Sequence, residues 1–422
     1  MRRMTVVMAV VGLLAGACGS GGSSSSGSGE QRTVLLDYKH DEFAGSFLRF
    51  YPATVKVRQG DTVRFKQSWS GEPHSVTAGL IVNELFKYQP IFEKYHSVEE
   101  ALAGGETQET VDKVVNTFTR IPGMTDQQGE IYPAGAEPCY VNNDADLPAF
   151  STADDQILKG VACPTRGQPQ PKFTGSQVLY NSGFIPYQGS KGNTFELPIA
   201  ADAKPGTYKF FCNYHWTEMN GTFEIVPKST SVPSQDAVGR QARKEIERDA
   251  KGPLAAVVKA EKGDFSAVKD AKPPFVGIPA AADPQHSALS INEFFPATVN
   301  ATVGKPVTWT ETASYHTISF NVPKYFPVFT VAKSGAVHWD PRSLKPVAWT
   351  VPDRPERPPG ANPEEPNPLH ADVGKWDGGG GFHSSGALEP GDTFTVTFTK
   401  PGTYLFACVL HPPMVGKVVV KA

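Results

Sequence analysis

The strongest constraint on the fold is an internal repeat, in which two stretches of the chain share one layout. The copies open with FYPATV at 50–55 and FFPATV at 294–299, and each opening is followed by a glycine turn and a strand-like run. They close with PGTYKFFC at 205–212 and PGTYLFAC at 401–408. Because both ends recur, we interpret the repeat units as whole domains, 31–227 and 285–422.

The pattern within the copies favours β-structure. The run TFTVTF at 393–398 alternates apolar and polar residues and leads into a turn at Lys400-Pro401-Gly402, as a half-buried strand does. Glycine (40 residues) and proline (37 residues) are abundant, and long helical patterns are scarce. The sequence therefore predicts an all-β chain made of two β-sandwiches.

Each domain is longer than a minimal sandwich, which predicts insertions. In the first, at about 80–177, Ser97-Val98-Glu99-Glu100 has the form of a capping box, and Thr110 to Thr119 has helical spacing. In the second, residues 321–380 are rich in Pro and Gly and predict an irregular loop. The segment 228–284 is expected to be a linker, helical from about Asp236 to Ala250 and broken later by Pro273-Pro274.

The N-terminus has the form of an export signal. Arg2 and Arg3 precede an apolar run from Val6 to Leu14, which is too short to span a bilayer. The signal is expected at 1–18, ending in a segment similar to a bacterial lipobox with Cys18 as the lipidated residue. A Gly/Ser tether follows at 19–30. We expect a lipid anchor at the outer face of a cell membrane or in the periplasm; an ordinary secretory signal is the alternative.

The other four cysteines fall into two pairs. Cys139 and Cys163 lie in one turn-rich stretch and are expected to form a disulfide outside the cytoplasm. Cys212 and Cys408 end the two repeat units, and each is followed by a His three positions later and then by a Met.

The repeated Cys, His and Met, with a His upstream in each copy, predict two metal centres. Copper that cycles between Cu(I) and Cu(II) favours a trigonal set of two His and one Cys with a weak axial Met. The expected ligands are His74, Cys212, His215 and Met219 in the first domain, and His316, Cys408, His411 and Met414 in the second. Any one of these residues alone would be explained better as core filler, and Cys212 with Cys408 could form a disulfide. The complete pattern, occurring twice, favours copper.

On these residues both halves resemble the cupredoxins, the plastocyanin, amicyanin and azurin group. The second ligand loop is similar to the short loop of amicyanin, and the first is one residue longer. The resemblance covers most of 31–79, 178–227, 286–320 and 381–422. It implies Greek-key sandwiches, type 1 (blue) copper, electron transfer, and loop histidines His215 and His411 near the surface.

Residues next to the ligands could support the two centres. Ser75 and Thr317 each follow an upstream His and could tie the ligand loops together by hydrogen bonds, or could be plain strand-edge hydroxyls. Trp216 and Pro412-Pro413 could form apolar rims for a redox partner, or could only stiffen the loops.

The remaining histidines bear on whether the protein is an enzyme. Two-domain nitrite reductases and small laccases hold further coppers through extra His beside the Cys or in His-x-His pairs, and this chain lacks both arrangements. Six histidines lie outside the ligand sets, and His338, His370 and His383 could form one extra site. We therefore expect an electron carrier with a redox partner protein rather than an enzyme.

Two other functions stay open. One is a multicopper redox enzyme of the nitrite reductase or oxidase kind, and the other is a copper-handling or delivery protein, although no Met-rich tract is present. A formal charge of −3 gives no indication of nucleic-acid binding.

Overall fold

The computed structural model describes residues 29–38, 40–67, 73–95, 97–122, 133–149, 163–185, 193–266, 268, 272–279, 289–324, 326, 328–331, 337–356, 367–411 and 413–422. The predicted signal at 1–18, Cys18 and nearly all of the tether at 19–30 lie outside these residues. Within the described residues no helix combines the length and apolar character needed to cross a membrane.

The first half is a sandwich of two sheets. One sheet has the order β3-β1-β5-β9. The other has the order β4-β11-β10-β6-β8-β7. Their bounds are β1 (Gln31–Leu36), β3 (Phe50–Tyr51), β4 (Thr54–Arg58), β5 (Thr62–Gln67), β6 (Thr77–Ala78), β7 (Cys139–Val141), β8 (Leu179–Asn181), β9 (Thr194–Pro198), β10 (Gly206–Cys212) and β11 (Trp216–Val226). Alternate side chains of these strands enter one apolar core, as the sequence pattern predicts.

The second half repeats this architecture. Its sheets have the orders β19-β21-β15-β12-β13-β2 and β14-β23-β22-β16-β20, and a separate hairpin joins β17 to β18. Their bounds are β2 (Gly45–Phe47), β12 (Phe275–Pro279), β13 (Leu289–Phe295), β14 (Thr298–Thr302), β15 (Pro306–Glu311), β16 (Ser319–Phe320), β17 (Phe329–Val331), β18 (Val337–Trp339), β19 (His370–Trp376), β20 (His383–Ser384), β21 (Thr393–Phe398), β22 (Gly402–Ala407) and β23 (Val415–Lys421). The molecule is therefore mostly β, as predicted.

The repeat extends to the packing of single side chains. In the last hairpin of each half, a phenylalanine faces a glycine: Phe210 faces Gly221, and Phe406 faces Gly416. A Cβ on either glycine would collide with the phenylalanine ring, so the glycine lets the ring lie across the neighbouring strand. The hairpin β10–β11 therefore corresponds to the hairpin β22–β23 residue by residue at this pair.

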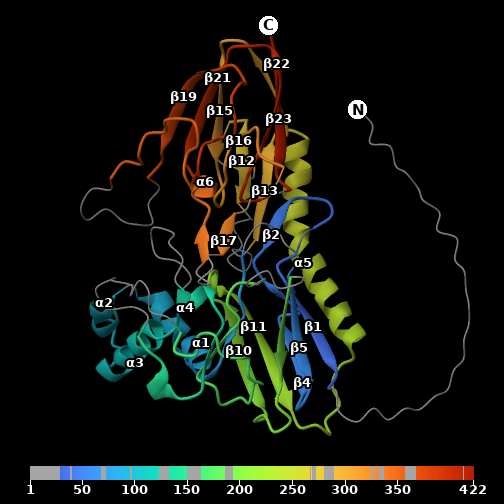
Figure 1. The fold of residues 1–422 in the computed structure, drawn as a ribbon, viewed down its shortest axis with the longest axis vertical. Helices are drawn as coiled ribbons and strands as arrows, with labels where there is room; N and C mark the ends of the chain where they lie inside the picture. The colour runs from blue at the N-terminus through green and yellow to red at the C-terminus, as the bar shows by residue number, and fades with distance from the viewer. Residues whose placement is uncertain are drawn as a thin grey trace, which may run out of the picture.

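The first insertion forms a helical layer beside its sheet (Figure 1). It contains α1 (Leu80–Lys94), α2 (Val98–Ala103), α3 (Gln108–Thr119), α4 (Pro133–Ala136) and the 3₁₀ turn η1 (Asp144–Asp146). The Ser97 side chain accepts a hydrogen bond from the Glu100 N–H, which confirms that a short helix begins at the predicted place. Helix α1 was not predicted. Cys139 and Cys163 form a disulfide within the insertion.

The expected linker is more than a connector. Helix α5 (Gln235–Glu261) continues past the predicted end at Ala250, includes Pro253, and runs along both halves (Figure 1). After it, β12 pairs with β13 on one side and with β15 on the other. Because it pairs on both sides, this strand of the segment 228–284 is a central strand of the second sandwich. The apolar residues Phe275, Val276 and Ile278 within it are buried.

The two halves share a sheet and a core. Strand β2 leaves the first half and adds to the edge of β13, with Ser46 opposite Ser290 and Phe47 opposite Leu289. Beneath this edge, Phe43, Phe47 and Tyr51 pack in one apolar cluster with α5, β12 and β13. This shared core fixes one half against the other and lies between the two predicted centres.

Candidate metal centres

The first predicted centre is assembled by two elements. Cys212 ends β10, and the chain turns through His215 into β11, where Met219 is buried in the same core as Cys212. His74 lies opposite Ile185, just before β6. The pairing of β6 with β10 brings the upstream histidine to the end of the cysteine strand.

The donor atoms of this centre converge. The Nδ1 atoms of His74 and His215 are 3.1 Å apart, and the Cys212 Sγ lies 3.5 Å from the Nδ1 of His215 and 4.0 Å from that of His74. All three donor atoms lie within 4.8 Å of one another. Each histidine therefore directs the nitrogen that the predicted site requires toward the thiol.

The surroundings favour a thiolate at Cys212. Burial raises the pKa of a thiol, but the charges of His215 and His74 and their hydrogen bonds outweigh it, so the pKa of Cys212 lies well below its usual value. His74 is completely buried, and its Nε2 lies 3.2 Å from the Asp37 carboxylate. Although burial opposes it, this contact raises the pKa of His74.

The second predicted centre has the same order of elements. Cys408 follows β22 directly, and its Sγ lies 3.6 Å from the His411 Nδ1. The Met414 N–H donates to the His411 carbonyl oxygen, and the Cys408 N–H donates to that of Met414. Burial again opposes ionisation of the thiol, but the hydrogen bond to His411 outweighs it and lowers the pKa of Cys408 to about 7.

The upstream histidine of the second centre is held differently. The rings of His316 and His411 have centroids 4.9 Å apart, against 4.8 Å for His74 and His215. However, the His316 Nδ1 lies 3.0 Å from Oε1 of Glu311, and its Nε2 lies 3.1 Å from Oδ1 of Asn292. For Nδ1 to bind a metal ion, His316 must therefore give up its contact with the Glu311 carboxyl group.

Both donor sets fit copper by their chemistry. Each offers one buried sulfur that is poised to ionise, two imidazoles and a buried thioether, which is the soft and borderline mixture that type 1 copper uses. The first set would hold the ion through His74, Cys212 and His215 as they stand.

The hydroxyl residues after the upstream histidines tie the ligand segments together. The Ser75 N–H and the Thr317 N–H each lie 3.4 Å from the sulfur of their centre. The Ser75 hydroxyl accepts from the Asn213 N–H, and the Thr317 hydroxyl accepts from the Val409 N–H. Each hydroxyl thus fixes the residue that follows the ligand cysteine.

Three supporting residues were missed by sequence reasoning, namely Asp37, Asn292 and Glu311. The pairing of β1 with β3 and of β12 with β13 makes Asp37 the counterpart of Gly277, and both have positive φ, 52° and 73°. Glu311 ends β15, as Gln67 ends β5. A local signal was available only for Glu311, which lies five residues before His316.

Several other expectations meet a different environment. His411 is only 3% exposed, so it does not lie at the surface as the resemblance implied. Trp216 packs against Phe118 of α3 and against Phe211, and thereby joins the ligand loop to the insertion. Pro412 lies outside the described residues.

The extra site considered for three histidines is not assembled in the part of the chain that the structure describes. His370 Nδ1 lies 2.9 Å from the Thr393 hydroxyl, and the His383 ring packs against the rings of Trp349 and Trp376. The side chain of His338 lies outside the description. Among the described residues, His74, Cys212 and His215 form the one group of three or more ligand-type side chains.

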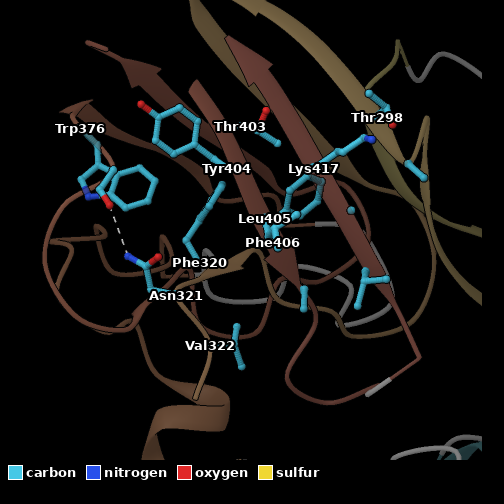
Figure 2. Close-up of a pocket in the computed structure, with 15 residues that line it drawn as sticks. Thr298, Phe320, Asn321, Val322, Trp376, Thr403, Tyr404, Leu405, Phe406 and Lys417 are labelled. Atoms are coloured by element: carbon cyan, nitrogen blue, oxygen red, sulfur yellow. Dashed lines mark hydrogen bonds between the residues drawn. The ribbon is translucent and has the colours of Figure 1, made fainter. Parts of the chain in front are cut away.

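A groove of about 900 Å³ is lined mainly by residues of β22 and β23, together with residues of the segments beside them. Figure 2 shows Trp376, Tyr404 and Leu405 among the side chains along it. Leu405 and Val415 are 70% and 63% exposed there. None of the eight predicted ligands lines this groove.

Comparison with known proteins assigns the second half. Residues 288–421 match the family of copper binding proteins, plastocyanin/azurin family. Among solved structures, a reduced amicyanin variant is 18% identical over 31% of this chain and 73% of its own, with a TM-score of 0.17. A purple cupredoxin from Nitrosopumilus maritimus is 20% identical over 31% of this chain and 83% of its own, with a TM-score of 0.16. The family match spans β13 to β23 and includes all four predicted ligands of the second centre, so residues 288–421 are a copper-binding domain of the plastocyanin/azurin family.

Proposed function

We propose that the chain is an electron-transfer protein with two type 1 copper centres, one in each half. The observation that carries the proposal is the convergence of His74, Cys212 and His215 within 4.8 Å, in the half that lies outside the family match. A copper-binding domain in the second half and the same ligand pattern in the first half together support two centres.

The surroundings of the ligands suit repeated one-electron transfer. Bound copper would supply the cycle between Cu(I) and Cu(II). The protein holds Cys212 and His74 in a sandwich core with their positions fixed by Ser75 and Asp37. A site fixed in this way changes little in geometry between oxidation states, which keeps the rearrangement that accompanies transfer small.

The proposal includes export and anchoring. The signal-like segment with Cys18 supports attachment by lipid at the outer face of a cell membrane or in the periplasm, where a redox protein would exchange electrons with the chain. The Cys139–Cys163 disulfide supports an oxidising compartment. In this proposal the protein is a carrier and has no substrate of its own.

A copper count on the purified protein tests the proposal. We expect two coppers per chain, blue absorption, and two type 1 signals in electron paramagnetic resonance. Cys212→Ala and Cys408→Ala should each remove one signal and leave the other. Ser343→Ala, at a buried hydroxyl remote from the ligands, serves as the control and should leave both. Fewer than two type 1 coppers, or steady turnover of nitrite or phenols, would contradict the proposal.

A further inference from the structure

The two candidate centres are linked by a buried chain of hydrogen bonds that crosses between the halves. At the first centre, the outer nitrogen of His74, Nε2, lies 3.2 Å from Oδ2 of Asp37. The other oxygen of this carboxylate, Oδ1, accepts a 2.7 Å hydrogen bond from the Phe47 N–H. The carboxylate of Asp37 thus connects a predicted copper ligand to β2.

The same strand reaches the second centre. Ser46 precedes Phe47 directly, and its hydroxyl accepts a 2.9 Å hydrogen bond from Nδ2 of Asn292. Oδ1 of Asn292 then lies 3.1 Å from the outer nitrogen of His316, Nε2. From His74 to His316 the chain therefore consists of four hydrogen bonds and the covalent bonds of the residues between them.

Burial makes this connection well ordered. Asp37 and Ser46 are completely buried, Phe47 is 1% exposed, and Asn292 is 2% exposed. The pairing of β2 with β13 fixes Ser46 and Phe47 opposite the residues that precede Asn292. Polar groups that are buried and hydrogen-bonded at both ends have little freedom to move.

We propose that this chain of contacts carries one electron between the two centres, so that the protein is an internal relay rather than a pair of independent carriers. The proposal rests on the proposed function, since it requires copper at both sites. With copper held at both sites by the ligands named above, loss of one electron would oxidise Cu(I) to Cu(II) at one centre, and its gain would reduce Cu(II) to Cu(I) at the other. No bond forms or breaks, and no proton has to move.

The physical reason is that electron tunnelling is coupled better through covalent and hydrogen bonds than across gaps between atoms. A second crossing exists, in which Tyr214 lies 4.7 Å from the ring of His215 and 6.2 Å from that of Trp339. Both of these separations are distances between ring centroids. The β2 chain instead ends on the rings of His74 and His316 themselves.

The test measures electron exchange within the fully copper-loaded protein. A light pulse in the presence of a photoreductant reduces less than one copper per chain, and optical spectra then follow redistribution between the two centres. The signals are assigned with Cys212→Ala and Cys408→Ala. We expect Ser46→Ala to slow the redistribution of electrons between the centres several-fold. Ser46→Thr retains the hydroxyl and should give a rate close to that of the native protein. Trp339→Phe and Ser343→Ala should leave the rate unchanged.

Metal-free protein provides an independent readout. In ¹⁵N spectra of the imidazoles, Ser46→Ala should shift the His316 Nε2 resonance, because the Asn292 amide loses the acceptor of its N–H while keeping the Ser290 hydroxyl on its oxygen. Ser343→Ala should not shift it.

The outcomes separate the relay from the proposed function. Two bound coppers with an exchange rate that Ser46→Ala leaves unchanged, or that Trp339→Phe slows instead, would overturn the relay and leave the two centres standing. A His316 Nε2 resonance that does not shift in Ser46→Ala would also overturn the relay. A protein with fewer than two coppers would overturn the proposed function, and the relay with it.

Discussion

At the level of single residues, the two upstream histidines differ in the charge of the group on their outer nitrogen. His74 faces the Asp37 carboxylate, whereas His316 faces the neutral amide of Asn292. A carboxylate strengthens an imidazole as an electron donor and favours the more positive metal ion. The first centre should therefore have the lower reduction potential, and electrons should move from it to the second.

Replacing the carboxylate tests this difference. In a Cys408→Ala background, Asp37→Asn should raise the reduction potential of the first centre, because the negative charge of the Asp37 carboxylate beside His74 is lost. It should also weaken Cu(II) binding by about 10- to 100-fold, the usual effect of removing a group that orients a metal ligand. Redox titration and competition with a chelator measure both quantities.

A second buried aspartate provides the control for this experiment. Asp61→Asn removes a carboxylate that accepts from backbone N–H groups of Glu30 and Arg58, away from the ligands. It should leave the potential unchanged. A potential that stays the same or falls in Asp37→Asn would contradict the assignment.

Glu311 competes with metal for His316. Burial raises the pKa of Glu311 well above its usual value. Its Oε1 accepts from the Thr312 and Ala313 N–H groups, and its Oε2 has no hydrogen-bond partner among the described residues. Glu311→Gln retains an oxygen for those N–H groups and weakens the hold on His316. We expect Cu(II) to bind the second centre up to about tenfold more tightly, since a hydrogen bond between neutral groups contributes about 0.5–1.5 kcal/mol.

The counterpart in the first centre provides the matched control for Glu311. Gln67→Glu introduces the carboxyl group at the equivalent strand end and should weaken copper binding there. Both affinities are measured in protein with the other cysteine replaced by alanine. Weaker binding in Glu311→Gln would show instead that the carboxylate assists the metal.

At the level of elements, the sequence predicted what is local and repeated. The strands next to the ligands could be predicted because alternation, turns and ligand spacing occur twice. Helix α2 could be predicted from Ser97 and Glu100, whereas α1 begins after Gly79 without a side-chain cap and contains Pro90. Strand β2 is three residues long and gains its stability from β13, so no local pattern marks it.

The same reasoning applies to the candidate sites. The eight candidate ligands could be singled out because a Cys, a His three positions later and then a Met occur twice, each with a His upstream. Asp37 and Asn292 could not, since each meets its histidine only when separate strands pair, whereas Glu311 lies only five residues before His316. Asn292 and Ser46 are 246 residues apart in the chain.

Gly45 tests the importance of the β2–β13 pairing. A Cβ at this position would lie 2.7 Å from the Ser290 carbonyl oxygen and 2.8 Å from the Phe43 ring. Gly45→Ala should therefore separate the strands and destabilise the protein by about 1–3 kcal/mol, the usual cost of overpacking a buried site. Calorimetry should then show the two halves unfolding in two separate transitions, whose midpoints lie further apart in the variant than in the native protein.

A glycine in helix α5 provides the contrasting variant. A Cβ on Gly252 would meet no atom within 4 Å, and the residue is exposed in the helix interior. Gly252→Ala should stabilise the helix by up to about 1 kcal/mol. Equal destabilisation by both variants would contradict the interpretation of Gly45.

At the level of the whole molecule, the boundary between the halves does not follow the repeat. The repeat alone predicts a second domain that begins at residue 285. The structure places β12 between β13 and β15, which makes it a central strand of that domain. Trp309 and Phe294 pack in the same core as Val276 of β12.

Fragments can establish where the second domain begins. A fragment of residues 272–422 retains β12 and should fold and bind one copper, although with lower stability than the full chain because β2 and α5 are missing. A fragment of residues 285–422 should remain largely unfolded, since β13 and β15 lose the strand that joins them. Circular dichroism and copper binding measure both. Equal folding of the two fragments would show that β12 is dispensable.

The pairing of β2 with β13 also determines which part of the chain must wait for its partner during synthesis. As the polypeptide is made from its N-terminus, β2 and the aromatic side chains of Phe43 and Phe47 emerge long before β13, their partner. Until then β2 has no strand to pair with, and Phe43 and Phe47 lack the apolar cluster that covers them, which are features through which nascent chains aggregate. We therefore expect a ribosome that stalls before residue 289 to leave a product that aggregates unless other proteins shield it.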